Sequence, residues 1–145
     1  MAKYRQGFYV PAHPEKYVGK GSIRYRSGWE KTAMAFFDNH PGIKQWASES
    51  IYIPYTCPLT GKTKNYIPDF FIIYETKDKV KKAEIIEIKP LKETGAKQVN
   101  SSRNKLIVAR NTAKWTAAVA YCEKNNIGFR VVTEVELFGA GKGKK

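Results

Sequence analysis

Two short apolar segments, each interrupted by a carboxylate, are the clearest pattern in this chain. Residues 67–74 read Ile-Pro-Asp-Phe-Phe-Ile-Ile-Tyr, and residues 84–90 read Glu-Ile-Ile-Glu-Ile-Lys-Pro. Runs of β-branched and aromatic residues of this length predict strands with a buried face. A charge in such a strand costs free energy unless it is paired or holds a metal ion. Asp69 and Glu87 therefore mark a candidate site.

Two helices are predicted, one on each side of these segments. Ser27 and Glu30 form a Ser-x-x-Glu capping box, so a helix is expected from Ser27 through Phe37 and should end at the turn around 41–42. A second helix is expected over residues 101–124, because Asn125-Asn126-Ile127-Gly128 is a typical helix stop.

The apolar runs predict four strands. Residues 49–55, 66–74 and 83–89 are joined by short polar turns, which favours an antiparallel meander, and a last strand is expected over 129–133. The order α-β-β-β-α-β predicts an α/β sandwich in which a central mixed sheet carries helices.

The two ends of the chain lack a persistent period of 2 or 3.6. Residues 1–26 are expected to form an extended arm that contains no regular element. The arm mixes basic residues with aromatic ones, which suits nucleic acid, but tyrosines that pack on their own domain would explain it equally well. Residues 27–138 are expected to be the folded domain, and the glycine- and lysine-rich residues 139–145 a flexible tail.

Charge adds a class of partner to this picture. The chain has 26 Lys and Arg against 13 Asp and Glu, a formal net charge of +13. Such a surplus favours polyanions and nucleic acid first, although a ribosomal-type basic protein would share it. No acid occurs from Thr94 to Tyr121, where three cations fall within an arc of roughly 40° on the second predicted helix. The predicted DNA contacts are Arg24, Arg26, Arg103, Arg110 and Lys114.

Several kinds of site are disfavoured by what the sequence lacks. Cys57 and Cys122 lie far apart and, with His13 and His40, show no zinc-type spacing, so both cysteines are expected to be reduced thiols in an intracellular protein. No apolar stretch is long enough for a signal peptide or a membrane span, so no membrane association is expected.

The two carboxylates suit the chemistry of phosphodiester hydrolysis. Mg²⁺ prefers hard oxygen ligands and keeps several waters, so Asp69, Glu87 and the Ile88 carbonyl would suffice to hold it, with Mn²⁺ as a substitute. Lys89 lies two residues after Glu87 and therefore on the same strand face, where its amine could orient the attacking water.

Alternative interpretations of these residues are open. Glu87 and Lys89 could form a salt bridge on a half-solvated strand, and Asp69 could simply start a strand. A rival Glu-x-Lys at Glu75 and Lys77 is disfavoured, because it lies at the far end of the strand that Asp69 begins.

The segments at 25–30, 66–70 and 86–90 resemble those of the PD-(D/E)xK nucleases, the restriction-endonuclease-like superfamily. Within that superfamily the pattern is similar to the TnsA-type transposon endonucleases and, across nearly the whole chain, to the head-completion nucleases of T-even-type tailed phages. The resemblance implies a restriction-endonuclease-like fold, catalytic roles for Asp69, Glu87 and Lys89, and Glu30 as a further member of the metal site.

The same resemblance implies a function. A protein of this kind would cut double-stranded DNA as a Mg²⁺-dependent endonuclease, with exonuclease action as a further property, during head completion and head–tail joining. Phage portal, neck or head proteins are the implied partners, and the host cytoplasm during assembly or the virion is the implied location. A non-catalytic DNA-binding neck protein and a TnsA-type recombination endonuclease are the alternatives, and a dimer would suit the cutting of both strands. Weak sequence specificity is expected, because basic residues contact phosphates without reading bases.

Overall fold

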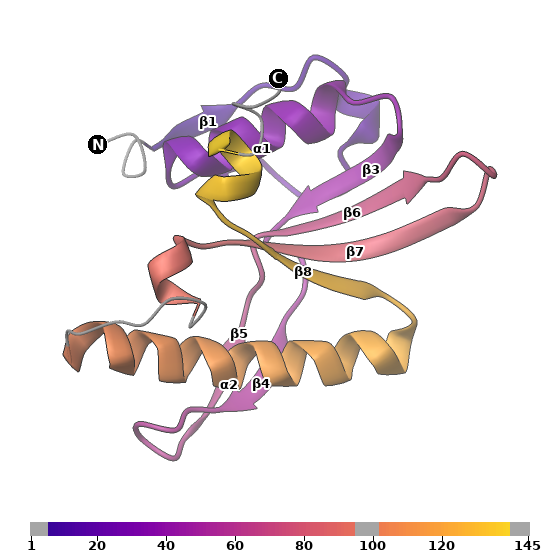
Figure 1. Cartoon of the computed structure of the whole chain (residues 1–145). Helices are drawn as coiled ribbons and strands as arrows, with labels where there is room; N and C mark the ends of the chain where they lie inside the picture. The colour runs from indigo at the N-terminus through magenta and orange to yellow at the C-terminus, as the bar shows by residue number, and fades with distance from the viewer. Residues whose placement is uncertain (1–5, 95–101, 140–145) are drawn as a thin grey trace.

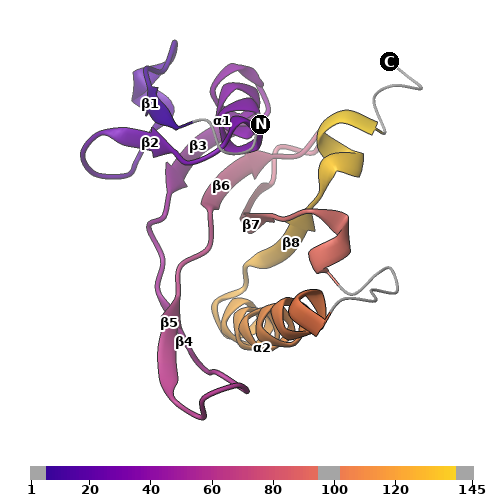
Figure 2. The same ribbon diagram turned by 90° about the vertical axis from the view of Figure 1, so that its left-hand side faces the viewer.

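A four-stranded mixed sheet lies between two helical layers in the computed structural model, which describes residues 6–94 and 102–139 (Figure 1). One helix lies on each face of the sheet, as the view turned by 90° also shows (Figure 2). The predicted α/β fold with a central mixed sheet is therefore confirmed. The elements of this body are α1 (Gly28–Asn39), β3 (Ile43–Ser48), β6 (Phe70–Glu75), β7 (Lys81–Ile88), α2 (Ser102–Asn125) and β8 (Gly128–Val132).

The strand order is β3-β6-β7-β8. β6 pairs antiparallel with both β3 and β7, whereas β8 runs parallel to β7 because the long crossover through α2 joins them. The register opposes Phe70 to Ile86. Asp69, the residue before β6, is thereby brought beside Glu87 near the carboxyl end of β7.

α1 begins as its sequence predicts. The Ser27 hydroxyl accepts a hydrogen bond from the Glu30 N–H (3.1 Å), and the Glu30 carboxylate accepts one from the N–H of Arg26 (2.9 Å), one residue earlier than the usual capping box. Met34 and Phe37 on the buried side of the helix pack against the sheet.

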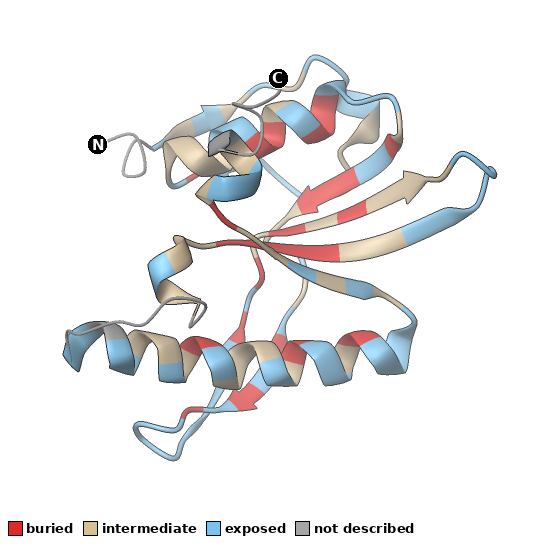
Figure 3. Ribbon diagram, in the orientation of Figure 1, coloured by how far each residue is buried: buried red, intermediate tan, exposed pale blue. Residues whose placement is uncertain are grey.

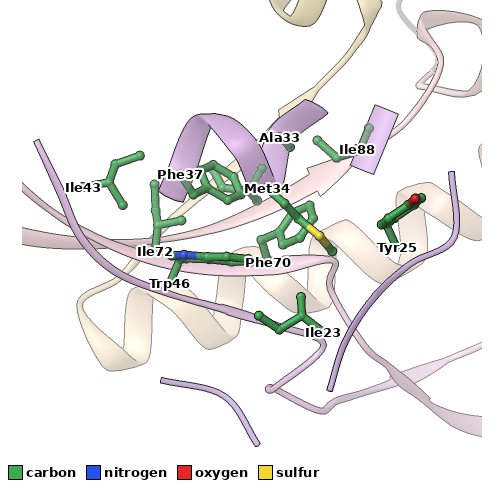
Figure 4. Packing of buried hydrophobic residues seen from close by; sticks show 11 residues of the cluster. Ile23, Tyr25, Ala33, Met34, Phe37, Ile43, Trp46, Phe70, Ile72 and Ile88 are labelled. Atoms are coloured by element: carbon green, nitrogen blue, oxygen red, sulfur yellow. The ribbon is translucent and has the colours of Figure 1, made fainter. Parts of the chain in front are cut away.

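Trp46 belongs to the apolar core between α1 and the sheet (Figure 4). Its indole is fully buried and meets the rings of Phe37 and Phe70, with centroids 5.9 and 6.4 Å away. Tyr17 stacks edge-on against the same ring at 4.7 Å, and Tyr9 at 6.1 Å. These N-terminal tyrosines therefore stabilise their own domain, which is the packing alternative left open above.

A second apolar core lies on the opposite face, where α2 covers β7. Ile85 of β7 and Ala118 of α2 are fully buried there, and Cys122 is almost so. Both cysteines are buried and free. Most of the outer surface of α2 is exposed, whereas the carboxyl-terminal half of β7 is buried (Figure 3).

The prediction that residues 1–26 contain no regular element is wrong. β1 (Gly7–Tyr9) and β2 (Ile23–Tyr25) form an antiparallel pair, and the short 3₁₀ helix η2 (Pro14–Lys16) lies between them. Strands of three residues are too short to show a period, so the sequence pattern could not reveal them. Ile23 and Tyr25 are buried in the core under α1, which joins this segment to the domain.

The prediction of a strand over 49–55 is also wrong. The first strand of the central sheet is β3, and the apolar residues after it belong to β4 (Ile53–Thr56), which pairs with β5 (Thr63–Tyr66) in a separate two-stranded ribbon. Glu49 has a φ of +50°, in the left-handed region, so the chain changes direction between β3 and β4. The predicted strand 66–74 is likewise divided, because β5 ends at Tyr66 and β6 begins at Phe70.

The C-terminal half follows the prediction more closely. α2 and β8 lie within a residue of their expected ends, while the short 3₁₀ helix η3 (Leu91–Glu93) and a π-helical turn, η4 (Val135–Gly139), were not expected. Residues 140–145 of the predicted tail lie outside the described residues. No helix in residues 6–94 and 102–139 is long and apolar enough to cross a bilayer.

Candidate active site

Asp69 and Glu87 are interlocked through the backbone. The Asp69 N–H donates to Glu87 Oε1 (3.2 Å), and the Ile88 N–H donates to Asp69 Oδ2 (2.7 Å). Pro68, which cannot donate to a ladder, lies in the irregular step between β5 and β6 that makes this approach possible. The two carboxylates therefore face one small volume from neighbouring strands.

Both carboxylates are held in an environment that disfavours their charge. Burial raises the pKa of Asp69 well above its ordinary value, and the negative charges of Glu87 and Glu30 add to this. Burial also raises the pKa of Glu87, although Lys89, the Tyr66 hydroxyl and the Asp69 N–H oppose the shift. Two adjacent carboxylates, one buried and one partly buried, fit a divalent cation, which would neutralise their repulsion.

The Ile88 peptide lies against Asp69, as the hydrogen bond from its N–H shows. The N–H and C=O of one strand residue point to the same side of the strand, so the Ile88 carbonyl faces the side of Asp69. The donor set of Asp69, Glu87 and this carbonyl is all oxygen, which suits Mg²⁺ or Mn²⁺.

Lys89 is brought to Glu87 as the spacing predicts. Its Nζ is 3.7 Å from Glu87 Oε2, and its side chain is 28% exposed while that of Glu87 is 5% exposed. Its backbone N–H donates to the Val132 carbonyl of β8 (3.0 Å), which fixes the end of β7. A pair with one partner this buried does not fit the interpretation of a solvated surface salt bridge.

Tyr66 is a site residue that the sequence pattern did not single out. Its hydroxyl donates to Glu87 Oε1 (2.8 Å), and the Lys114 ammonium lies 5.7 Å from the centre of its ring. Tyr66 lies three residues before Asp69 in the sequence, and only the fold shows that its hydroxyl meets Glu87. Lys114, predicted as a DNA contact on the basic ridge of the second helix, lies half-buried beside the carboxylates.

Glu30 lies close enough to Asp69 for its charge to act on that carboxyl, and it also caps the start of α1. Burial raises the pKa of Glu30, while its hydrogen bond from the Arg26 N–H opposes the shift. In the described parts of the chain, no three acidic, histidine or cysteine side chains come together as metal ligands. The catalytic role of Glu30 therefore stays a prediction, beside a capping role that is seen directly. Glu30 and Lys89 both line a cavity of about 200 Å³, with Ser27, Trp29, Ile88, Pro90 and Glu93.

The five predicted DNA contacts are not equivalent. The Arg26 guanidinium forms a bidentate ion pair with the Glu49 carboxylate, with Nε to Oε2 at 3.0 Å and Nη2 to Oε1 at 3.2 Å. Arg24 Nη2 donates a hydrogen bond to Gln6 Oε1 (2.6 Å). Arg103 is exposed near the start of α2, whereas Arg110 is half-buried, facing the ribbon that β4 and β5 form. Arg110 and Lys114 are thus brought toward the carboxylates, and DNA binding by all five stays a prediction.

Comparisons with known proteins show the family of this chain. Residues 40–134 match the model of the family "TnsA-like endonuclease N terminal". The chain is 36% identical over 146 residues to the head completion nuclease of Enterobacteria phage T4, and the match covers 93% of this chain and 95% of that relative. No solved structure matches the chain significantly.

The family match includes Asp69, Glu87 and Lys89 and begins after Glu30. TnsA-like endonuclease domains have the restriction-endonuclease-like fold, in agreement with the mixed sheet described above. By its match to the family model and its similarity to the phage relative along nearly its whole length, this chain belongs to the TnsA-like endonuclease family of the restriction-endonuclease-like superfamily.

Proposed function

We propose that this chain is a Mg²⁺-dependent DNA nuclease that acts in phage head completion. The observation that carries the proposal is the interlocked pair of the partly buried Asp69 and the buried Glu87, beside the ammonium of Lys89. Family membership supports cleavage of a phosphodiester, and the carboxylates supply the ligand chemistry for it.

In this proposal each side chain has a defined task. Asp69 and Glu87, with the Ile88 carbonyl, would hold Mg²⁺, which when bound neutralises charge on the phosphate and lowers the pKa of a bound water. Tyr66 fixes Glu87 by donating to Oε1, which leaves Oε2 directed toward Lys89. Lys89 would orient the attacking water and stabilise the negative charge that develops on it.

The biological setting is taken from the relative and is part of the proposal. A nuclease of head completion would act on packaged phage DNA as an endonuclease, with exonuclease action as a further property, and would contact portal, neck or head proteins. Its place would be the host cytoplasm during assembly or the virion. The net charge of +13 suits a DNA substrate.

A cleavage assay tests the proposal. Purified protein is expected to nick supercoiled plasmid and to cut linear and branched DNA with Mg²⁺ or Mn²⁺, and to lose this activity in EDTA. Folded protein that cuts none of these substrates would contradict the proposed activity and favour a non-catalytic DNA-binding role. Release of mononucleotides from linear DNA distinguishes exonuclease from endonuclease action.

Metal binding has a readout that is independent of cleavage. Mg²⁺ at a hundredfold excess over its dissociation constant is expected to raise the melting temperature of the DNA-free protein by ~5–10 °C. In Asp69→Asn this rise should largely vanish, while the metal-free variant should melt no lower than the wild type because a buried repulsion is removed. Asp78→Asn, at an exposed turn, is the matched control. An equal rise in Asp69→Asn and the wild type would place the ion elsewhere.

A further inference from the structure

The elements on the α2 side of the active site carry positive charge without acids. Residues 50–68, which include the β4–β5 ribbon, contain no Asp or Glu, and neither does α2 from Ser102 to Cys122. The ribbon packs against α2 through Ile53, Tyr55 and Tyr66, and Asp69 lies three residues after its last residue. The ribbon lies beside α2 and continues toward β6 (Figure 2). Because Tyr66 at the end of the ribbon donates to Glu87, the seam between the ribbon and α2 leads toward the candidate carboxylates.

The pairing of the ribbon determines which of its side chains face α2. Ile53 is opposite Tyr66 and Tyr55 is opposite Lys64, so these four share one face. Because Ile53, Tyr55 and Tyr66 are buried in the core with α2, Lys64 continues the same face toward the ribbon tip. The opposite face carries only uncharged, exposed residues, namely Pro54, Thr56, Thr63 and Asn65.

Four cations follow this seam, and we call Lys89, Lys114, Arg110 and Lys64 the basic seam. Burial lowers the pKa of Lys114, and the nearby charges of Lys89 and Arg110 lower it further. Arg110 in turn lies close enough to Tyr55 to oppose the rise in pKa that burial causes there. Cys57 lies two residues after Tyr55. A hydrogen bond from the Leu59 N–H is the main reason that the pKa of its thiol falls to about 7, and the positive charge of Lys64 nearby lowers this pKa further.

The basic seam is not fully neutralised from within the described parts of the chain. There, Lys64, Arg110 and Lys114 form no salt bridge, and Lys89 forms one, with Glu87. Lys114 also lies within the electrostatic reach of Glu87 and Asp69, so the site carboxylates offset part of the charge at that end. Cations held this close repel one another, and a polyanion that runs along them would remove the repulsion. Arg110 and Lys114 are one helical turn apart, about 6 Å along the helix axis, so they can meet different phosphates.

We infer that the basic seam holds the phosphates of the DNA strand that enters the active site, from Lys89 at the carboxylates to Lys64 near the ribbon tip. This inference rests on the proposed function, because it gives the substrate of that same site its path. The tyrosines of the seam are buried, so the seam contacts the backbone and leaves the bases unread. The ribbon is then a DNA-holding arm, which was not expected from the sequence.

The salt dependence of DNA binding tests the inference without cleavage. Binding of a short duplex and of the matching single strand is measured in EDTA at several salt concentrations for the wild type, Lys64→Gln and Lys82→Gln. Lys64 and Lys82 are both exposed strand lysines, and Lys82 lies on β7 at the far end of the sheet. Losing one phosphate contact should lower the slope of log K against log salt by ~0.9 on duplex or ~0.7 on a single strand.

The inference predicts this lower slope for Lys64→Gln on at least one of the two DNA forms, and an unchanged slope for Lys82→Gln. An unchanged slope for Lys64→Gln on both forms, or an equal fall in the two variants, overturns it. The form on which the slope changes identifies the bound strand as duplex or single. If the protein cuts no DNA but Lys64→Gln still lowers the slope, the proposed nuclease activity is refuted while DNA binding along the basic seam stands. The failure of one proposal can therefore be distinguished from the failure of the other.

Discussion

Replacing Glu87 by glutamine is expected to reduce DNA cleavage by about 10³-fold or more while leaving the protein folded. The substitution removes one negative charge from the pair that would hold Mg²⁺, and a metal ion contributes several kcal/mol of transition-state stabilisation, each 1.4 kcal/mol being a factor of about ten. Nicking of supercoiled plasmid at saturating Mg²⁺ measures the effect directly.

The fold should tolerate this change because of how Glu87 is held. A glutamine oxygen can still accept from the Tyr66 hydroxyl and the Asp69 N–H, so neither donor is left unpaired. Burial disfavours the charge of Glu87, so an uncharged amide there should not lower the melting temperature. A loss of activity without a loss of stability would separate catalysis from structure.

Glu75→Gln is the matched control for Glu87→Gln. Glu75 belongs to the rival Glu-x-Lys, ends β6 far from the site, and lies 3.6 Å from Lys44 in a partly exposed ion pair, which is worth little. Its variant should therefore cut DNA at the wild-type rate. Normal cleavage by Glu87→Gln, or equal losses in the two variants, would contradict the assignment of the site.

The candidate catalytic residues could be predicted from the sequence because the pattern that marks them is local. Asp69 follows a proline at the start of an apolar run, and Glu87 and Lys89 share a strand face through the period of two. The cap of α1 at Ser27 is equally local. Such features depend on a few consecutive residues, so the sequence alone suffices to find them.

Other parts of the fold depend on distant partners and could not be found this way. β3 contains Lys44, Gln45 and Ser48, and only its pairing with β6 makes it a strand, whereas the more apolar residues after it form the ribbon. Tyr66 and Lys114 reach Glu87 because α2 packs across that ribbon. Tertiary packing of this kind overrides local strand propensity.

Asp38 is the most consequential residue that the sequence did not indicate. In the sequence it belongs to the polar turn Asp38-Asn39-His40, where an exposed carboxylate is the ordinary expectation. In the structure it is fully buried near the end of α1 and accepts hydrogen bonds from the Tyr9 hydroxyl (2.7 Å) and the N–H groups of Ala12 (2.6 Å) and His13 (2.9 Å). One carboxylate thus fastens the N-terminal segment to α1.

Asp38→Ala is expected to lower the free energy of unfolding by about 2–4 kcal/mol at neutral pH, because three partly buried donors lose a charged acceptor. Urea unfolding followed by tryptophan fluorescence measures the loss, since Trp46 lies against Tyr9 in the same core. Asp78→Ala, at an exposed turn, should change the unfolding free energy by less than about 0.5 kcal/mol.

The loss caused by Asp38→Ala should also depend on pH in a defined direction. Burial alone would raise the pKa of Asp38, but its hydrogen bonds from Tyr9, Ala12 and His13 hold the pKa below the ordinary value. The stability it supplies is therefore fully present above the unfolded pKa of about 4 and is lost as pH falls through the lower folded value. Subtracting the variant from the wild type removes the opposite contributions of Asp69 and Glu87, whose pKa values are raised. The difference between wild type and variant should thus be largest near neutral pH and shrink in acid, and a difference that grows in acid would contradict this role of the carboxylate.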